Sequence, residues 1–323
     1  MGRYMNARVQ YLFLLLMVAG CTPDNISFLN PQGPIAAAQR WHFVLVSALV
    51  MLVVLPVLVL TPLVAWRYRR KNQKARYTPK WDFSMPVEFA IWGIPVAIVA
   101  VLVVLLWRST AALDPYSPLE ADKPPLRVQV VGLDWKWLFI YPDEHIATVG
   151  VLAFSADRPL ALELTSDSVM QSFFIPALGG QIYAMAGMVT KLHLAAFSPG
   201  VFTGENTQFS GTGFHRQKFT AVAMHRDKFA AWVEKVRTNG ISLDEATYRM
   251  LARKSTPERA NEELGTAAMP RGVLYFTDVP SGLFATIVDK YRYGRANEVT
   301  RDQVRNGAAP LSPILVTGRE TRQ

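Results

Sequence analysis

Residues 41–66, WHFVLVSALVMLVVLPVLVLTPLVAW, form an apolar run that only three polar side chains interrupt. A helix rises about 1.5 Å per residue, so this run exceeds the roughly 20 residues that a bilayer requires. Trp41 and Trp66 bracket the run, which is typical of aromatic residues at membrane interfaces. Pro56 and Pro62 would bend such a helix. The run therefore predicts a first transmembrane helix over 41–66.

A second apolar run, residues 87–107, VEFAIWGIPVAIVAVLVVLLW, predicts a second span. The loop between the spans, 67–86, carries seven Lys or Arg residues from Arg67 to Lys80. Short basic loops stay in the cytoplasm, so both ends of this hairpin are expected to face outward.

The basic loop also explains much of the formal net charge of +9 in this 323-residue chain. A membrane-flanking cluster accounts for such a charge without a nucleic-acid partner, and the lipid bilayer is the expected surroundings. The single cysteine, Cys21, excludes an intramolecular disulfide and any cysteine-based metal site after it.

The N-terminus has the pattern of a secretory signal over 1–20: a basic head, a short apolar stretch and small residues. Its last residues with Cys21, VAGC, are similar to a bacterial lipobox, in which the cysteine is acylated. An ordinary signal peptide with an incidental cysteine is the alternative. Residues 21–40 would then lie in the periplasm of a bacterium with two membranes, which agrees with the orientation of the hairpin.

The remainder of the chain predicts a globular domain with additions. Short alternating segments such as Leu160–Leu164 and Lys218–Ala223, separated by turn residues, predict an antiparallel β-sandwich over 113–225. Helical segments follow in an extension over 226–296. Residues 297–323 are polar, without a periodic apolar face, and are expected to be disordered.

Glu88 is an ionisable residue at the cytoplasmic mouth of the second span. Such residues are costly unless they are solvated or paired, and many serve ion paths. A first-turn acid favoured by the helix dipole, or one reaching the interface, is the structural alternative.

Two segments carry a family resemblance: residues 168–179, SVMQSFFIPALG, and residues 208–220, QFSGTGFHRQKFT. Together with the hairpin, the chain resembles subunit II of the haem-copper oxidases, whose outer domain is a cupredoxin-like (Greek-key) sandwich. The cytochrome c oxidases of that family hold a dinuclear copper-A centre there. The corresponding positions here are Gln171 and Gln217 for the two histidines, Phe209 and Gly213 for the two cysteines, Gly211 for the glutamate and Thr220 for the methionine.

Every side-chain ligand is thus replaced, and the soft sulfur donors that favour copper are missing. Nearby His215 and His225 cannot rebuild the centre without thiolates and are expected to be surface residues. A copper-free subunit II is typical of the bo-type ubiquinol oxidases. Further segments are similar to that branch, namely VGLDWKW (131–137), FIYP (139–142), QIYAMAGM (181–188) and YFTDVP (275–280).

The resemblance implies a non-catalytic subunit of a proton-pumping ubiquinol oxidase in the bacterial inner membrane. Its partners would be subunit I, which would hold the haems and copper-B, and smaller subunits; this chain would bind no metal or cofactor. Ubiquinol would be the substrate of the complex. By the same resemblance, Glu88 would lie at a proton entrance, and Trp135 and Trp137 would be core or docking aromatics.

Two competing hypotheses remain open from the sequence. One is a copper-A subunit of a cytochrome c oxidase, which the missing cysteines oppose. The other, from a different class, is a free-standing membrane lipoprotein that serves as a binding module.

Overall fold

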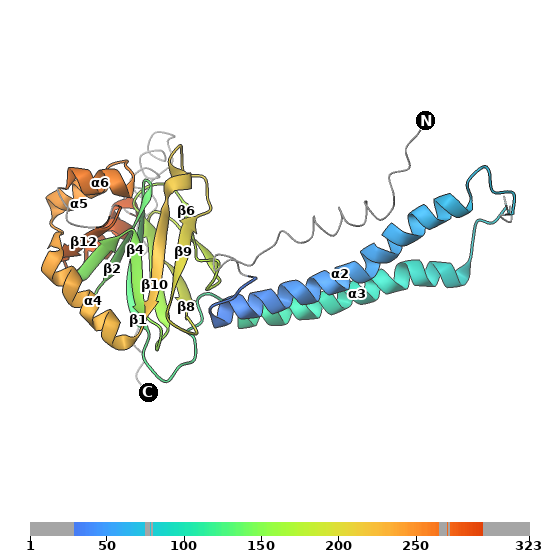
Figure 1. Cartoon of the computed structure of the whole chain (residues 1–323), viewed down its shortest axis with the longest axis horizontal. Helices are drawn as coiled ribbons and strands as arrows, with labels where there is room; N and C mark the ends of the chain where they lie inside the picture. Colours follow the sequence, from blue (N-terminus) through green and yellow to red (C-terminus); the bar gives the residue numbers. More distant parts are fainter. Residues whose placement is uncertain (1–28, 75–77, 79, 265–269, 271, 293–323) are drawn as a thin grey trace, which may run out of the picture.

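The computed structural model describes residues 29–74, 78, 80–264, 270 and 272–292. A helical hairpin projects from one side of a β-sandwich, and the helices that follow the sandwich cover its other side (Figure 1). The predicted class, a two-helix hairpin followed by a β-sandwich with C-terminal helices, is confirmed. Cys21, the signal segment 1–20 and the tail 297–323 lie outside the described residues.

The hairpin consists of α2 (Pro34–Arg67) and α3 (Met85–Ala112). Each helix begins with a proline in its first turn, where the missing N–H costs nothing. Asn72 ends α2 by donating its side-chain N–H to the carbonyl of Arg67 at 2.7 Å. Both helices are long and apolar enough to cross a membrane, and each extends beyond the span predicted for it.

The first turn of α2 packs on the sandwich. The backbone N–H of Gln32 donates to the carbonyl of Ala177 at 2.7 Å, and that of Ala36 donates to Leu178 at 3.2 Å. Ala36 is fully buried, and Gly179, with a φ of +90°, lies against its backbone. The N-terminal end of α2 is thus attached to the loop between the strands β6 and β7.

Two sheets make the sandwich. The seven-stranded sheet has the order β11 (Ile241–Ser242), β12 (Leu274–Thr277), β3 (Ile146–Val149), β2 (Lys136–Tyr141), β1 (Leu126–Leu133), β5 (Leu160–Ser166) and β8 (Thr190–Leu194). The five-stranded sheet has the order β4 (Val151–Ser155), β10 (Lys218–Met224), β9 (Gly200–Asn206), β6 (Gln171–Phe174) and β7 (Gln181–Ala184).

The prediction of a purely antiparallel sandwich is wrong, because β1 pairs parallel with β5, β4 with β10 and β11 with β12. Parallel neighbours need a connection that crosses over rather than a tight hairpin. Between β1 and β5, and between β4 and β10, the chain visits the other sheet, whereas between β11 and β12 it passes through two helices. Alternating sequence patterns alone do not reveal such connections.

Aromatic rings fill the space between the sheets. Trp137 and Phe139 from β2 meet Phe173 from β6 and Phe219 from β10. The rings of Phe173 and Phe219 stack at 5.1 Å, and that of Trp137 lies edge-on to Phe173 at 5.3 Å. Offset and edge-on pairs of this kind are favourable beyond the area they bury.

A second core lies on the outer face of the larger sheet. It is covered by α5 (Glu245–Leu251), α6 (Pro257–Glu263) and the helix over residues 283–292. The buried side chains of α4 (Arg226–Asn239) instead join the aromatic core of the sandwich. Leu138 and Ile140 point into it, whereas Trp137 and Phe139 point between the sheets. Strand β2 is therefore buried on both faces, which explains its continuous apolar and aromatic sequence from Trp137 to Tyr141.

The extension over 226–296, predicted to be helical, also supplies two strands to the sheet. Strand β12 pairs with β3, through Leu274 opposite Val149 and Phe276 opposite Ala147. The extension is therefore built into the sandwich domain and is not an appendage to it.

Candidate functional site

Two of the six residues that stand at the copper-A ligand positions meet in the interior. Gln217 donates its side-chain N–H to the side-chain oxygen of Gln171, and also to the carbonyl of Leu133 at 3.2 Å. Gln171 in turn donates to Leu133 at 3.0 Å and to the hydroxyl of Ser168 at 2.9 Å. Both glutamines are fully buried. Their amides thus tie together the loops that would hold a metal in the copper-bearing relatives.

Asn206, at the end of β9, completes this network, and sequence reasoning missed it. Its side-chain N–H groups donate to Gln217 at 2.9 Å and to the hydroxyl of Ser210 at 3.1 Å. Its oxygen accepts the backbone N–H groups of Ser172 and Gln208, both at 2.9 Å. The one available signal was a polar residue at an inward position of an alternating strand.

Trp135 fills the space beside the positions that correspond to the glutamate and the second cysteine. A side chain at Gly213 would overlap the Trp135 ring, and one at Gly211 would touch it. The indole N–H donates to the carbonyl of Ser210 at 3.2 Å, and Lys254 Nζ lies 4.9 Å from the ring centre. The packing of Trp135 therefore requires glycine at position 213, whereas at position 211 the φ of +109° favours it.

These contacts restrict the docking role predicted for the two tryptophans. Trp137 is 1% exposed and belongs to the core between the sheets, so it cannot contact a partner. Trp135 is half-buried, with Gly213 and Lys254 against its ring. A docking role is thus open only to the part of Trp135 that remains exposed.

Two other residues that stand at copper-A ligand positions are on the surface. Phe209 is 68% exposed and contacts only the ring of Phe214 among aromatic neighbours that the structure describes, at 5.2 Å. Thr220 is exposed because it alternates with buried Phe219 and Ala221 along β10. Phe209 lies in the loop after β9 and Thr220 lies on β10. The side chains of both residues are outside the buried amide network.

The residues present do not fit a copper-A centre. The interior positions offer neutral amides, and amides supply no thiolate or imidazole donor. His215 and His225 are both exposed. Among the described residues, no group of three or more His, Cys, Asp or Glu side chains could hold a metal ion. We derive no electron-transfer step through this pocket.

Lys136 is a buried ammonium group beside the amide network. Its Nζ donates to four oxygens within 3.0 Å: the carbonyls of Asp134, Arg253 and Ser255 and the hydroxyl of Ser255. Burial lowers the pKa of Lys136 to about 8, although the nearby charge of Asp134 opposes this shift. The lysine attaches the tip of the β1–β2 hairpin to the linker between α5 and α6.

Glu88 lies in the first turn of α3, at the end of the hairpin that is far from the sandwich (Figure 1). The indole N–H of Trp92, one turn later, donates to its carboxylate at 3.2 Å. This contact orients the carboxylate along the helix. Glu88 is therefore remote from the amide network, and any function of the two sites is separate.

Comparison with known proteins places the chain among respiratory oxidase subunits. It is 44% identical over 290 residues to the ubiquinol oxidase subunit 2 of Acetobacter aceti, covering 89% of each chain. It is 43% identical over 277 residues to the cytochrome bo(3) ubiquinol oxidase subunit 2 of Pseudomonas putida, covering 86% of this chain and 83% of that one. The chain belongs to the ubiquinol oxidase subunit 2 family. This assignment holds over the copper-A alternative.

Other comparisons are weaker. No family model matches the chain. The periplasmic domain of subunit II of cytochrome oxidase from Bradyrhizobium japonicum is 20% identical, with a TM-score of 0.36, and covers 38% of this chain and 98% of that one. A chain of a heme-copper terminal oxidase dimer has a TM-score of 0.32 at 16% identity, over 41% of this chain and 97% of that one.

We predict that Gly213→Val destabilises this ubiquinol oxidase subunit 2 family member by about 1–3 kcal/mol, because the new side chain would displace the Trp135 ring. The thermal unfolding midpoint and the tryptophan fluorescence would both change. Thr212→Ala, at an exposed neighbouring position, is the matched control and should change stability by less than about 0.5 kcal/mol. Equal midpoints for the two variants would contradict the packing described for Trp135.

Lys136 gives a prediction for the pH dependence of stability. The unfolded chain keeps the lysine proton up to its ordinary pKa of 10.5, whereas the folded chain releases it near 8. Because the unfolded state binds more protons in this window, the Lys136 contribution to stability rises with pH between these values. The free energy of unfolding of the wild type relative to Lys136→Met should therefore increase from about pH 8 to pH 10. If this difference in the free energy of unfolding is constant or falls over that range, the pKa of Lys136 is not lowered. The accepting oxygens would then affect the pKa at least as strongly as burial does.

Proposed function

We propose that this chain is a non-catalytic subunit of a proton-pumping ubiquinol oxidase, which oxidises ubiquinol and reduces oxygen to water. Its 43–44% identity to subunits named as parts of ubiquinol oxidases carries the proposal. The amide-filled pocket supports it, because quinol is a lipid-soluble donor. Such a donor can pass electrons directly to a cofactor within the membrane, without a metal relay in an outer domain.

In this proposal the haems and copper-B belong to subunit I, and smaller subunits complete the complex. The hairpin would lie beside subunit I in the bacterial inner membrane, with the sandwich in the periplasm above it. The apolar side chains of α2 and α3 are exposed over most of their surface. Exposed apolar helices of this length require lipid or protein neighbours.

Purification from membranes in a mild detergent tests the proposal. Haem should co-purify with the tagged chain at a constant ratio, and the preparation should consume oxygen when ubiquinol is supplied. A chain that purifies without haem or oxidase activity would instead support the free-standing lipoprotein module.

We also propose that Glu88 collects protons at the cytoplasmic face of the complex. Its place in the first turn of α3 next to the basic loop would give it access to water, and Trp92 would fix the direction of its carboxylate. The role is collection at an entrance and not proton transfer at the site of oxygen reduction.

Glu88→Gln should therefore slow oxygen consumption while the haem content per chain stays the same, because a neutral amide has no ionisable proton to take up and release at neutral pH. Steady-state oxygen uptake measures the effect. Trp92→Phe, which keeps the carboxylate but removes its indole donor, should reduce the rate less. Unchanged oxygen uptake in Glu88→Gln would exclude the proton-entry role.

The acylation proposed for Cys21 gives a separate prediction. Cys21→Ala should remove the lipid, detected by intact-mass spectrometry, and leave oxidase activity unchanged. Two membrane helices bind the bilayer far more strongly than one acyl anchor. Loss of activity in an assembled complex without the lipid would show that the anchor has a further role.

A further inference from the structure

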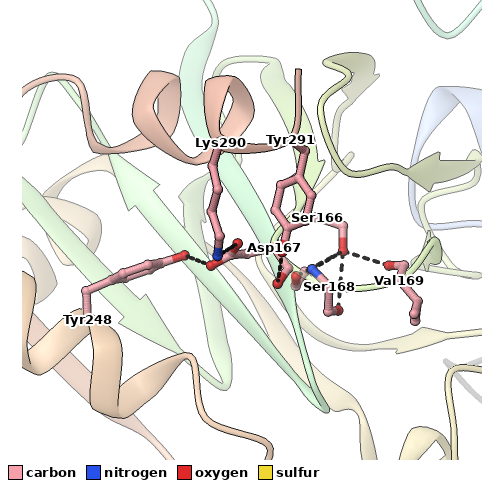
Figure 2. A network of polar contacts seen from close by, with 8 residues as sticks. Ser166, Asp167, Ser168, Val169, Tyr248, Lys290 and Tyr291 are labelled. Atoms are coloured by element: carbon pink, nitrogen blue, oxygen red, sulfur yellow. Dashed lines mark hydrogen bonds and ion pairs between the residues drawn. The ribbon is translucent and has the colours of Figure 1, made fainter. Parts of the chain in front are cut away.

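Two buried charges attach the C-terminal extension to the sandwich. The first is Asp167, between β5 and β6, whose side chain is 1% exposed. Its carboxylate accepts the hydroxyl of Tyr248 at 2.7 Å and pairs with Lys290 Nζ at 2.7 Å (Figure 2). The hydroxyl of Tyr291 donates to the backbone carbonyl of Asp167 at 2.9 Å. This buried charge therefore has a counter-charge in direct contact.

The second buried charge is Lys136, and the hydrogen-bond acceptors that the structure describes for it are neutral oxygens. Lys136 is 1% exposed. Its Nζ lies 2.8 Å from the carbonyl oxygen of Arg253 and 3.0 Å from that of Asp134. Ser255 contributes both its carbonyl oxygen, at 3.0 Å, and its hydroxyl, at 2.9 Å. We name these four oxygens the oxygen cage.

The oxygen cage is also positioned by contacts that do not involve the lysine. The backbone N–H of Ser255 donates to the carbonyl of Asp134 at 3.1 Å, so the two segments that supply the oxygens are joined directly. Leu251, at the end of α5, is fully buried, and the side chain of Thr256 caps the start of α6. A substitution at Lys136 therefore leaves three carbonyls and a hydroxyl around the vacated space.

Negative charge lies beside the oxygen cage. Burial lowers the pKa of Lys136, whereas the charges of Asp134 and Glu263 oppose this shift. The carboxylate oxygen Oδ1 of Asp134 is itself buried, without a hydrogen-bond partner among the residues that the structure describes. Buried acceptors and charges are costly unless they are paired. The cage would thus attract a cation from solution if the ammonium group were absent.

The contact distances indicate which cations fit the cage. Protein oxygens bind Mg²⁺ at about 2.0–2.1 Å and Ca²⁺ at about 2.3–2.6 Å. The cage distances of 2.8 to 3.0 Å are longer and fit a larger, monovalent cation. K⁺ and a primary ammonium group are similar in size, and both are larger than Na⁺. Backbone carbonyl oxygens also replace the hydration shell of K⁺ in selective channels.

We propose that the oxygen cage is a binding site for a primary ammonium group or a K⁺ ion, and that the side chain of Lys136 is its built-in occupant. The tethered ammonium group joins the turn before β2 to the linker between α5 and α6, as a structural ion does in a metalloprotein. This inference is independent of the proposed function, because neither a partner chain nor quinol enters it.

The affinity of the cage for a free cation is expected to be weak. Burial opposes any charge in the cage, and the four oxygens must offset that cost. A free cation also loses translational freedom on binding, so occupancy requires concentrations on the order of millimolar. Measurements are made at pH 7, where Lys136 of the wild type is protonated because its pKa is about 8.

The first test uses Lys136→Ala in the full chain, purified from membranes in a mild detergent. Alanine keeps Cβ, so n-propylammonium matches the side-chain atoms that the variant lacks. The measurement is hydrogen exchange at the backbone N–H of Ser255, by mass spectrometry of peptides. Exchange should become at least about tenfold faster in the variant, because hydrogen bonds to a charged group are lost. Propylammonium should slow this exchange again, and K⁺ should slow it less, because it leaves the space of the methylene groups empty.

Tetramethylammonium at the same ionic strength is the control ion, because it has no N–H group and is too large for the cage. Lys235→Ala, at an exposed position on α4, is the control variant and should exchange as the wild type does with every ion. Protection of Lys136→Ala by propylammonium but not by tetramethylammonium supports the proposal. No protection by propylammonium, or equal protection by both ions, would overturn it.

Lys136→Met keeps most of the packed volume without the charge, so it tests the cage even if Lys136→Ala does not accumulate. Exchange at the backbone N–H of Ser255 should again be faster than in the wild type. Propylammonium should have no effect here, because the methionine side chain fills the space that the ion would need. Exchange of this variant at the wild-type rate would show that the cage requires no positive charge, which contradicts the proposal.

Discussion

The hydrogen bond between the buried amides of Gln217 and Gln171 joins loops that are far apart in the sequence. Around it, Leu133 accepts from both glutamines and Asn206 binds Gln217, so few buried polar atoms lack a partner. A buried amide left without a partner costs about 1–3 kcal/mol. Loss of one side chain from such a network therefore destabilises the fold through the polar groups that remain unpaired. In relatives with copper, metal–ligand bonds tie the corresponding loops together, and here neutral amides do so.

This replacement has consequences for the surrounding residues. The Trp135 ring lies against Gly213, so there is no room for a cysteine side chain at position 213. The extension then adds two polar attachments, Lys136 to the linker between α5 and α6 and Asp167 to Tyr248 and Lys290. These contacts, all made within the chain, hold the loops around the two glutamines.

Much of the architecture was predictable, because its signals are local. The apolar runs over 41–66 and 87–107 are unmistakable, and the alternation in β1, β5 and β10 marks strands. The family resemblance assigned Gln171 and Gln217 to the two histidine positions of one centre, and in the structure a direct hydrogen bond joins them. Parallel pairing of β1 with β5 was missed, since alternation does not encode the direction of a neighbouring strand.

The remaining features depend on contacts between distant parts of the chain. Asn206, Lys136 and Asp167 look like ordinary polar residues in the sequence. Each has a distant partner, namely Gln217, Arg253 and Tyr291, which lie 11, 117 and 124 residues away. Trp137 was predicted as a core or docking residue, and its burial follows from the packing of the two sheets, because its ring lies between them. Glu88 differs from these residues because its contact with Trp92 is local. The proton-entry role proposed for it would depend on a partner chain.

The central claim is that the hydrogen-bonded amides of Gln171 and Gln217 occupy the position of a copper-A centre, so that the sandwich does not bind copper there. The most direct test is the copper content of the purified full chain after incubation with excess copper and removal of loosely bound ions, measured by mass spectrometry of the metal and by electron paramagnetic resonance. The account predicts copper far below one ion per chain and no signal from a dinuclear centre. Stoichiometric copper that is lost on substitution of Gln171 or Gln217 would contradict it.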